Sequence, residues 1–405
     1  MPLVRAKATG LRVVATDCTK KKIVYLSTAH PAMDPRMFFK EALTASQHGH
    51  RVCVIAPHER PEILHGIRVL PLGRWKSRIL RGTLAAARVF IAAVRHRADL
   101  YHFSDPELLP WCWALQALTR RPAVFDMHEY YAESIRSKRW ILRPLRRPIA
   151  WMYDRVEALF LKRMAGVVTV NEDLADRVRR RGGNVLVAPN YPRRDIFEDA
   201  AVDEEVLARY EDRRVVVYVG GLSEERGISR AIEVTARLRN NHPDALMLFV
   251  GGFGCPEYRR IVDALVDRLG VRDHVEFVGR VPHTEVPSYL AVAEVALFLL
   301  QPVNVRYEWG EPIKYFEYTA AGLPIVVSDL PAKRRLAERI GNGVVVDPLN
   351  AEEIAQAISS LLQDPKRRQS MGEEGRKAFL ETYNWDHVGK TLLRWYAEVG
   401  GWCDG

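Results

Sequence analysis

The chain has 405 residues, enough for two domains that each bury a core, and its composition is that of an ordinary globular protein. Its formal net charge is +10. No apolar run approaches the ~20 residues of a membrane-spanning helix, because the longest candidate, residues 84–94, is short and contains Arg88. Residues 1–20 lack the apolar core of a secretory signal, and residues 1–21 are expected to form an extension.

The cysteines show no paired spacing of the kind that holds zinc. Scattered cysteines without a disulfide framework indicate a reducing compartment, so the sequence predicts a cytoplasmic protein. The five are Cys18, Cys53, Cys112, Cys255 and Cys403.

Short runs rich in β-branched residues alternate with helical patterns along both halves of the chain. Such alternation predicts parallel sheets built from right-handed βαβ units, that is, two Rossmann-like doubly wound α/β domains facing a central cleft. In the first half the expected strands are 23–26, 52–55, 69–72, 100–103, 123–126, 167–170 and 185–188, with helical patterns such as 37–47 and 151–164. In the second half they are 215–219, 246–250, 275–277, 295–299, 325–327 and 344–346.

Two prolines and a polar run at 189–197 are typical of a linker between the two halves. We therefore predict an N-terminal Rossmann-like domain over 1–195 and a C-terminal Rossmann-like domain over 196–378. The aromatic stretch 379–405 is expected to form a helix that packs back toward the N-terminal domain.

The positive charge is concentrated in residues 63–98 and 134–153, which contain no acidic residue. Both stretches also carry tryptophan and aliphatic side chains, a mixture that suits an anionic membrane surface. Nucleic acid is the competing partner for basic patches, but no nucleic-acid motif is present. Solvated arginines on helix faces remain the plain alternative. The residues expected at the membrane are Arg74, Trp75, Lys76, Arg78, Arg81, Arg139, Trp140, Arg143, Arg146 and Arg147.

The segment 311–329 carries the strongest functional signal. It predicts a helix beginning after Pro312 and ending near Gly322, followed by a buried strand at 325–327. Helix N-termini beside the carboxyl ends of parallel strands are where nucleotides bind. In the first turns of this helix, Lys314 can meet a phosphate and the Glu317 carboxylate can accept two ribose hydroxyls.

The amino-acid sequence of this segment resembles the donor motif of the retaining family-4 glycosyltransferases, which have the GT-B fold. The resemblance runs from about residue 22 to about residue 396, and its pieces follow expected strands in the family's order. Besides 311–329, they are His30–Arg36, Asp99–Pro110, Phe125–Tyr130, Gly220–Gly227 and Phe277–Val281.

The resemblance implies a nucleoside diphosphate-sugar donor, UDP- or GDP-linked, and no separate cofactor. It also implies that the domain over 196–378 binds this donor and that the domain over 1–195 binds the acceptor. Because the leaving group is a diphosphate, positioned cations should stabilise the transition state. Arg226 and Lys314 are placed for this role, Arg280 is a further source of charge, and the backbone around Val281 should meet the base. No Asp-x-Asp metal motif is present, so metal-independent transfer is expected.

Three positions depart from the family pattern. Relatives often have a second histidine where this chain has Ser104, so His102 alone remains of that pair, and His128 is another catalytic candidate. Relatives also carry a glutamate at the position of Trp309, where Glu308 or Glu311 could substitute. Gly221 replaces a common arginine, which removes one diphosphate cation.

The leading hypothesis is therefore a retaining glycosyltransferase that acts on a lipid-linked glycan intermediate of bacterial surface polysaccharide synthesis. The protein would be located in the cytoplasm, peripheral to the inner face of the cell membrane. A non-catalytic partner subunit and a nucleotide-sugar epimerase remain as alternatives. A dinucleotide oxidoreductase is disfavoured because the glycines at 251–254 do not complete the Gly-x-Gly-x-x-Gly spacing at Glu257.

Overall fold

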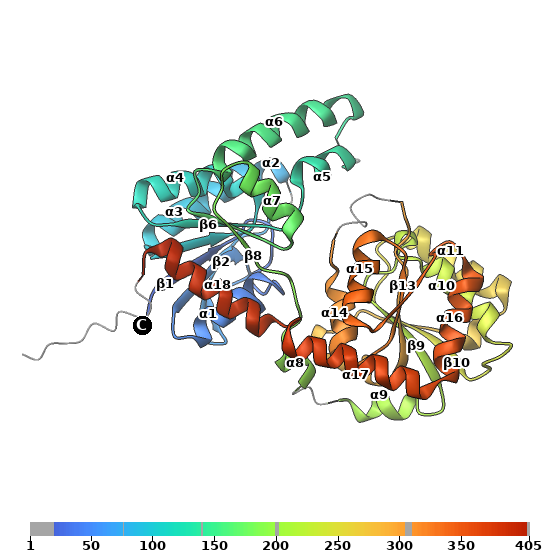
Figure 1. Cartoon of the computed structure of the whole chain (residues 1–405). Coiled ribbons are helices and arrows are strands. Elements are labelled where there is room, and N and C mark those ends of the chain that lie inside the picture. Colours follow the sequence, from blue (N-terminus) through green and yellow to red (C-terminus); the bar gives the residue numbers. More distant parts are fainter. Residues whose placement is uncertain (1–19, 76, 139–140, 199–201, 304–309, 403–405) are drawn as a thin grey trace, which may run out of the picture. The chain divides into compact units, whose positions relative to one another are not determined.

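The computed structural model describes residues 20–75, 77–138, 141–198, 202–303 and 310–402. These residues form two compact units (Figure 1). The first comprises the described chain up to Val168, Arg177–Leu186, and the chain from Leu392 onward. The second comprises Thr169–Asp176 and Val187–Thr391. Within the described ranges, no helix combines the length and apolarity needed to cross a membrane.

The first unit is built on an eight-stranded sheet of order β3-β4-β2-β1-β5-β6-β7-β8. Strands β4, β2, β1, β5 and β6 pair in parallel, and β3 pairs antiparallel with β4. The strands are β1 (Lys22–Leu26), β2 (Arg51–Pro57), β3 (Glu62–Leu64), β4 (Ile67–Leu72), β5 (Leu100–Phe103), β6 (Ala123–Met127), β7 (Gly166–Thr169) and β8 (Val185–Val187).

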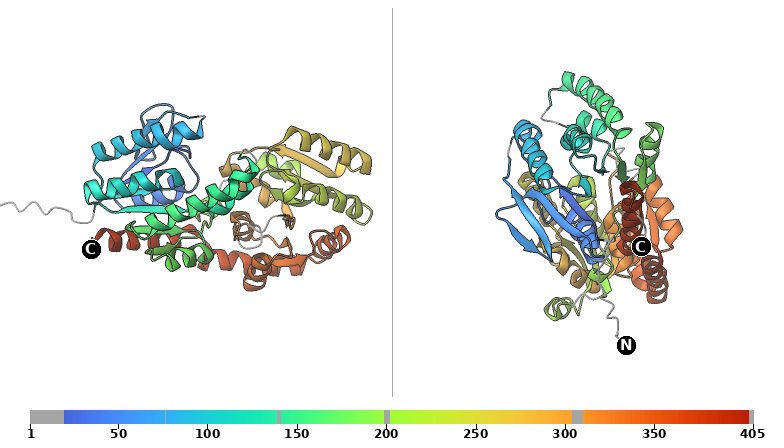
Figure 2. Two further views of the ribbon diagram at one scale, coloured as in Figure 1. Left: turned by 90° about the horizontal axis from the view of Figure 1, so that it is seen from above. Right: turned by 90° about the vertical axis from the view of Figure 1, so that its left-hand side faces the viewer.

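Helices pack around this sheet, as the views in Figure 2 show. Helix α18 (Trp385–Gly400) lies within the expected C-terminal helical stretch and ends in the first unit, where a Cβ added to Gly166 would lie 2.3 Å from the Trp395 ring. The other helices are η1 (Met37–Ala42), α1 (Leu43–Gln47), α2 (Arg78–Leu80), η2 (Arg81–Ala85), α3 (Ala86–His96), η3 (Pro106–Leu108), α4 (Leu109–Thr119), α5 (Tyr131–Ser137), α6 (Arg143–Leu161) and α7 (Glu172–Arg180).

The second unit is built on a six-stranded parallel sheet of order β11-β10-β9-β12-β13-β14. Its strands are β9 (Arg214–Val219), β10 (Ala245–Val250), β11 (Val275–Gly279), β12 (Ala293–Phe298), β13 (Ile325–Ser328) and β14 (Gly343–Val346). Its helices are α8 (Asp195–Glu198), α9 (Glu204–Arg209), η4 (Glu224–Arg226), α10 (Ile228–Leu238), α11 (Pro256–Leu269), η5 (Arg272–His274), η6 (His283–Glu285), α12 (Val286–Ala291), α14 (Ile313–Ala320), α15 (Pro331–Ile340), α16 (Ala351–Gln363) and α17 (Pro365–Glu381).

Both faces of the second sheet are buried, as the continuous Val-rich runs require. Along β9, Val216 and Tyr218 join one hydrophobic cluster, whereas Val215, Val217 and Val219 join the other. This alternation follows from the two-residue period of a strand. The chain leaves β9 toward β10 and β11, then returns to β12 on the other side of β9, which makes the β9–β12 border a topological switch point.

The predicted fold class is confirmed: each unit is a Rossmann-like α/β structure, and every predicted strand is present. Strand β3 was missed because it is a three-residue antiparallel edge strand outside the βαβ pattern. The helix expected at 151–164 begins earlier, at Arg143. The domain boundaries at 195 and 378 stay predictions.

Candidate functional site

Three glycine-containing loops meet at the carboxyl ends of β9, β10 and β11. The Gly220 amide donates to the Val250 carbonyl (2.7 Å), and the Leu222 amide donates to the Gly252 carbonyl (3.0 Å). Gly251 has φ +154°, and a Cβ there would lie 1.9 Å from the Gly220 oxygen. Only glycine permits this close approach of two backbones.

Helix α14 places a lysine directly over these loops. Because the Val219 amide donates to the Tyr318 hydroxyl (2.8 Å), the helix is tied to the end of β9. Lys314 then reaches across Gly220, where an added Cβ would lie 1.8 Å from the lysine Nζ. The ammonium donates to the Tyr218 hydroxyl (3.2 Å) and lies over the Tyr218 ring.

Burial lowers the pKa of Lys314 to about 7, the nearby Arg226 charge acts in the same direction, and Glu317 opposes both. An anion bound beside this amine would favour its charged form. A diphosphate at this position would therefore restore the positive charge that burial disfavours.

The other predicted binding residues gather at the same edge of the second sheet. Arg226 ends the short helix η4 just before α10 and is half-buried. Arg280 follows β11, and its side chain covers Gly252, where a Cβ would lie 2.6 Å from the arginine Nε. Val281 is partly buried and packs against the hydrophobic cluster that contains Val215, Val217 and Val219. Gly221, in contrast, faces open space.

Glu317 follows Lys314 by one helical turn and is 5% exposed. Its Oε1 lies 2.7 Å from Nε2 of His283 in η6. The sequence reasoning missed His283, although it lies two residues beyond the loop that carries Val281. Its closeness to Val281 in the sequence is the signal that could have identified His283 as a site residue.

Glu311 lies before α14 and forms an ion pair with Arg339 (2.9 Å). The alternative glutamate, Glu308, and the departure at Trp309 lie outside the described residues. Beside Glu311, the Lys333 ammonium donates to the Gly310 carbonyl (2.6 Å).

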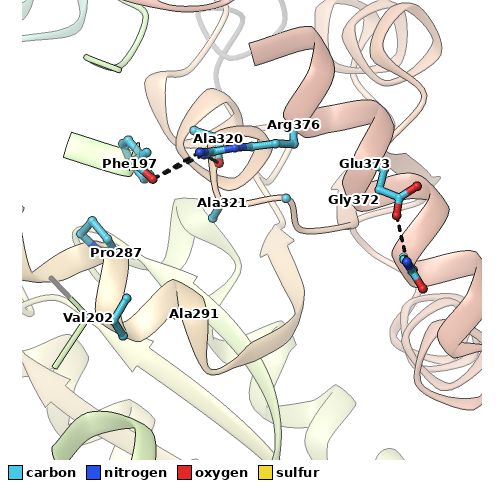
Figure 3. Close-up of a pocket in the computed structure, with 11 residues that line it drawn as sticks. Phe197, Val202, Pro287, Ala291, Ala320, Ala321, Gly372, Glu373 and Arg376 are labelled. Atoms are coloured by element: carbon cyan, nitrogen blue, oxygen red, sulfur yellow. Dashed lines mark hydrogen bonds between the residues drawn. The ribbon is translucent and has the colours of Figure 1, made fainter. Parts of the chain in front are cut away.

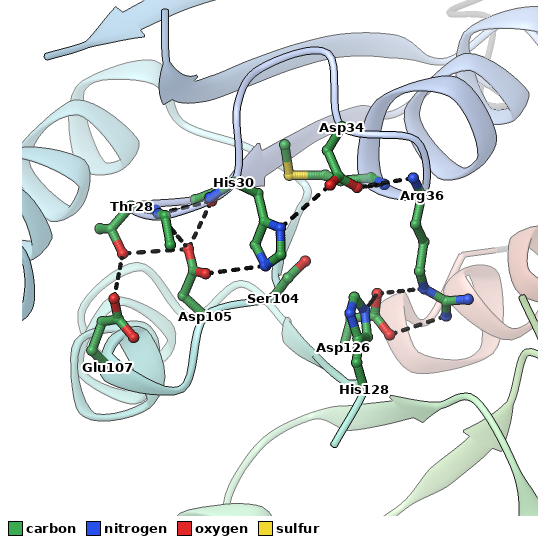
Figure 4. Close-up of polar contacts among 12 residues, drawn as sticks. Thr28, His30, Asp34, Arg36, Ser104, Asp105, Glu107, Asp126 and His128 are labelled. Carbon is green, nitrogen blue, oxygen red and sulfur yellow. Dashed lines mark hydrogen bonds and ion pairs between the residues drawn. The ribbon is translucent and has the colours of Figure 1, made fainter. Parts of the chain in front are cut away.

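In the first unit, polar side chains collect after β1, β5 and β6 (Figure 4). The carboxylate of Asp126 accepts two hydrogen bonds from Arg36, at 2.9 and 3.0 Å. The same carboxylate forms a hydrogen bond with Nε2 of His128, whose side chain is 23% exposed. His128 is thus oriented by a buried carboxylate, which is the arrangement that fixes the tautomer of a catalytic imidazole.

His30 lies between two carboxylates. Its Nδ1 is 3.3 Å from Asp34, and its Nε2 is 3.5 Å from Asp105. The hydrogen bond to Asp34 raises the pKa of His30 to about 9; burial opposes this shift and the Asp105 charge supports it. The ring is therefore an imidazolium at neutral pH. Its centroid lies 6.3 Å from that of His128.

His102 is fully buried, unlike His30 and His128. Its Nδ1 lies 2.7 Å from the Tyr396 hydroxyl, and its Nε2 lies 3.1 Å from Glu41. Burial alone would lower the pKa of His102, but Glu41 and Asp126 raise it to about 9. Because the imidazole is fully buried, a catalytic role for His102 stays a prediction.

Ser104 is 1% exposed, and its hydroxyl has no hydrogen-bond partner among the described residues. The buried cluster of Glu41, His102 and Asp126 has the ligand types of a metal site. Arg36 nevertheless lies against both carboxylates, 3.2 Å from Glu41 and 2.9 Å from Asp126, and supplies the positive charge that an ion would bring. These residues do not fit a metal.

The second unit also contains a cavity of about 490 Å³ at the carboxyl end of α14, away from Lys314 (Figure 3). Arg376 of α17 donates to the main-chain oxygens of Ala320 and Phe197 at its rim. None of the predicted site residues lines it. Its lining residues are Phe197, Val202, Pro287, Ala291, Ala320, Ala321, Gly322, Gln369, Gly372, Glu373 and Arg376.

The predicted membrane residues lie on α2, η2, α6 and the segments before them. Arg74, Arg78, Arg143 and Arg147 are exposed. Trp75 is instead half-buried under the Arg88 guanidinium, Arg81 pairs with Glu107, and Arg146 donates to the Ile141 carbonyl. Lys76, Arg139 and Trp140 lie outside the described residues. The apolar side chains exposed on or beside α6 are Leu142, Leu145, Trp151, Met152, Val156 and Leu159.

Two family models match consecutive parts of the chain. The model of glycosyl transferases group 1 matches residues 199–378, and that of a glycosyl transferase 4-like domain matches residues 41–191.

Two individual relatives match parts of the chain at modest sequence identity. The chain is 28% identical over 249 residues to alpha-D-kanosaminyltransferase of Streptomyces kanamyceticus, covering 59% of this chain and 62% of that protein. It is 31% identical over 185 residues to a GDP-mannose-dependent alpha-(1-6)-phosphatidylinositol monomannoside mannosyltransferase of Mycolicibacterium smegmatis, covering 45% and 47%. The matches thus span about half to three fifths of these curated relatives.

Solved structures share the fold. Sucrose-phosphate synthase of Thermosynechococcus elongatus superposes with a TM-score of 0.73 at 19% identity, covering 94% of this chain and 100% of that one. Anabaena HepE in complex with UDP-glucose gives 0.69 at 16% identity, covering 93% and 100%. At these identities the likeness shows the fold alone.

Proposed function

Since the chain belongs to the group 1 glycosyltransferases with the GT-B fold, we propose that it transfers a sugar from a nucleoside diphosphate to an acceptor with retention of configuration. The observation that carries the proposal is the Lys314 ammonium, which covers Gly220 at the switch point of the second sheet. This is where an α/β sheet binds a nucleotide.

The leaving diphosphate gains negative charge as the sugar departs. Lys314 and Arg226 lie near enough to interact electrostatically, and both can stabilise that charge. The amino end of α14 adds a partial positive charge. We propose that these protein groups act in place of a metal ion.

The donor is proposed to be a UDP- or GDP-sugar. Relatives provide the support for both bases: the mannosyltransferase of M. smegmatis is named as GDP-mannose-dependent, and HepE was solved with UDP-glucose. Glu317 would accept the ribose hydroxyls, and the loop at Arg280 and Val281 would meet the base.

The acceptor is proposed to bind at the first unit, beside His30, Ser104 and His128. His128 can hydrogen-bond an acceptor hydroxyl while Asp126 holds its other side. The Ser104 hydroxyl has no partner among the described residues but is buried, so the acceptor would reach it only if the covering atoms move. The leaving phosphate would take the acceptor's proton, so that no strong base is required.

Nucleotide binding tests this proposal directly. We expect either UDP or GDP at ~100 times its dissociation constant to stabilise the wild type by roughly 2.7 kcal/mol in thermal unfolding, with ADP and CMP as comparison ligands. Glu317→Ala should lose this stabilisation, because the ribose loses its acceptor. Glu381→Ala, which alters an exposed glutamate of α17, should keep it.

Stabilisation by no nucleotide would instead favour a non-catalytic partner subunit. Donor isomerisation without an added acceptor would indicate an epimerase.

We further propose that the first unit docks on an anionic membrane and that the acceptor is lipid-linked. The exposed arginines and the apolar side chains of α6 support this idea, since cationic and apolar groups together favour an anionic interface. Transfer would then occur at the inner face of the cell membrane, in surface polysaccharide synthesis.

Sedimentation with anionic liposomes at physiological salt checks the membrane proposal. The wild type is expected to pellet with the vesicles. A double variant, Arg143→Glu and Arg147→Glu, should have an affinity for the vesicles at least roughly tenfold lower. Arg60→Glu provides a control, because Arg60 is exposed on the same unit outside α6. A wild type that stays in the supernatant would end the idea.

A further inference from the structure

The carboxylate expected to receive the ribose already has a partner. Glu317 Oε1 lies 2.7 Å from His283 Nε2, and the glutamate side chain is 7% exposed. The two residues come from different elements, α14 and η6, and are 34 positions apart. Because this contact joins α14 to η6, it fixes the position of one element relative to the other.

The bond occupies one of the two carboxylate oxygens. Within the described chain, no other hydrogen bond to the Glu317 side chain is present, so Oε2 remains available. A carboxylate has about four lone-pair positions, enough for His283 and two ribose hydroxyls together. The histidine is 47% exposed and can keep this bond while a nucleotide enters.

We propose that His283 is a positioning residue of the nucleotide site, which orients Glu317 so that its carboxylate receives the ribose diol. The proposal rests on the function proposed above. Because a nearly buried carboxylate without a donor would turn toward other partners, the histidine N–H holds it in the conformation that accepts both hydroxyls. His283 also lies two residues after Val281, so the segment expected at the base also orients the ribose acceptor.

The role is specific to the ribose, which gives a sharp experiment. Titration calorimetry would compare the nucleotide that stabilises the wild type with its 2′,3′-dideoxy analogue. In the wild type, the ribonucleotide is expected to bind more tightly than the analogue. In His283→Ala, its affinity should fall by about tenfold, while the affinity of the dideoxy analogue stays unchanged.

Two further variants complete the comparison. His283→Gln, whose amide can donate to Glu317, should recover part of the preference for the ribonucleotide. His387→Ala, which removes an exposed histidine of α18, should match the wild type.

The outcomes separate the two proposals. A wild type that binds no nucleotide overturns the proposed function. A wild type that binds, with His283→Ala showing the same preference for the ribonucleotide, overturns the positioning role alone. An equal loss for both ligands also overturns it, because a general structural defect does not distinguish the two riboses.

Discussion

A protein with alanine at position 220 is expected to transfer sugar about a hundredfold more slowly than the wild type. The added Cβ would lie 1.8 Å from the Lys314 Nζ, so the lysine must leave its position over the loop. The backbone φ of +132° adds strain for any side chain. Steady-state kinetics with a saturating acceptor would measure the loss, and nucleotide titration would show whether donor binding accounts for it.

The neighbouring glycine supplies a matched control. A Cβ on Gly221 would meet no atom within 4 Å, so Gly221→Ala should keep nearly full activity. Thermal unfolding of both variants separates a displaced lysine from a damaged fold. Equal activities of the two variants would contradict the role of Lys314, because one substitution displaces it and the other does not.

Replacing Arg36 by alanine is expected to destabilise the first unit by about 3–5 kcal/mol. Arg36 is 4% exposed and pairs with Asp126 and Glu41, both fully buried. Burial alone would raise the pKa of Asp126, but the Arg36 charge holds it well below its usual range. Without the guanidinium, two carboxylates remain in the interior with too little positive charge, and the unfolding transition should fall by roughly 10 °C or more.

Scanning calorimetry of the whole chain would record this change. Arg180→Ala removes an exposed arginine from α7 in the same unit and should shift the transition by less than about 2 °C. If Arg36→Ala behaves like Arg180→Ala, another group compensates the buried carboxylates, and Arg36 does not stabilise the first unit.

The sequence was sufficient for the fold because βαβ units repeat a local signal. Each buried strand is a short Val- and Ile-rich run, and helix α14 is bounded by Pro312 and by Gly322, which has φ +71°. Lys314 and Glu317 could be placed on one helix face because they are three residues apart. These features depend on neighbours in the chain, which a sequence displays directly.

The pairings within the site were not predictable in the same way. His283 meets Glu317 from another loop, and Tyr396 meets His102 across 294 positions. In β5 every residue is buried, so the alternation of a half-exposed strand could not show that His102 points inward. Such contacts depend on how distant elements are brought together, and one sequence carries no record of them.

The contact between Tyr396 and His102 also bears on synthesis of the protein. The strands that surround His102 leave the ribosome early, whereas Trp395 and Tyr396 emerge only after the whole second unit has been translated. Until then, the face of the first unit beside Gly166 and His102 lacks the side chains that cover it. The first unit to be translated is consequently the last to complete its packing, and a nascent chain must protect that face in the interval.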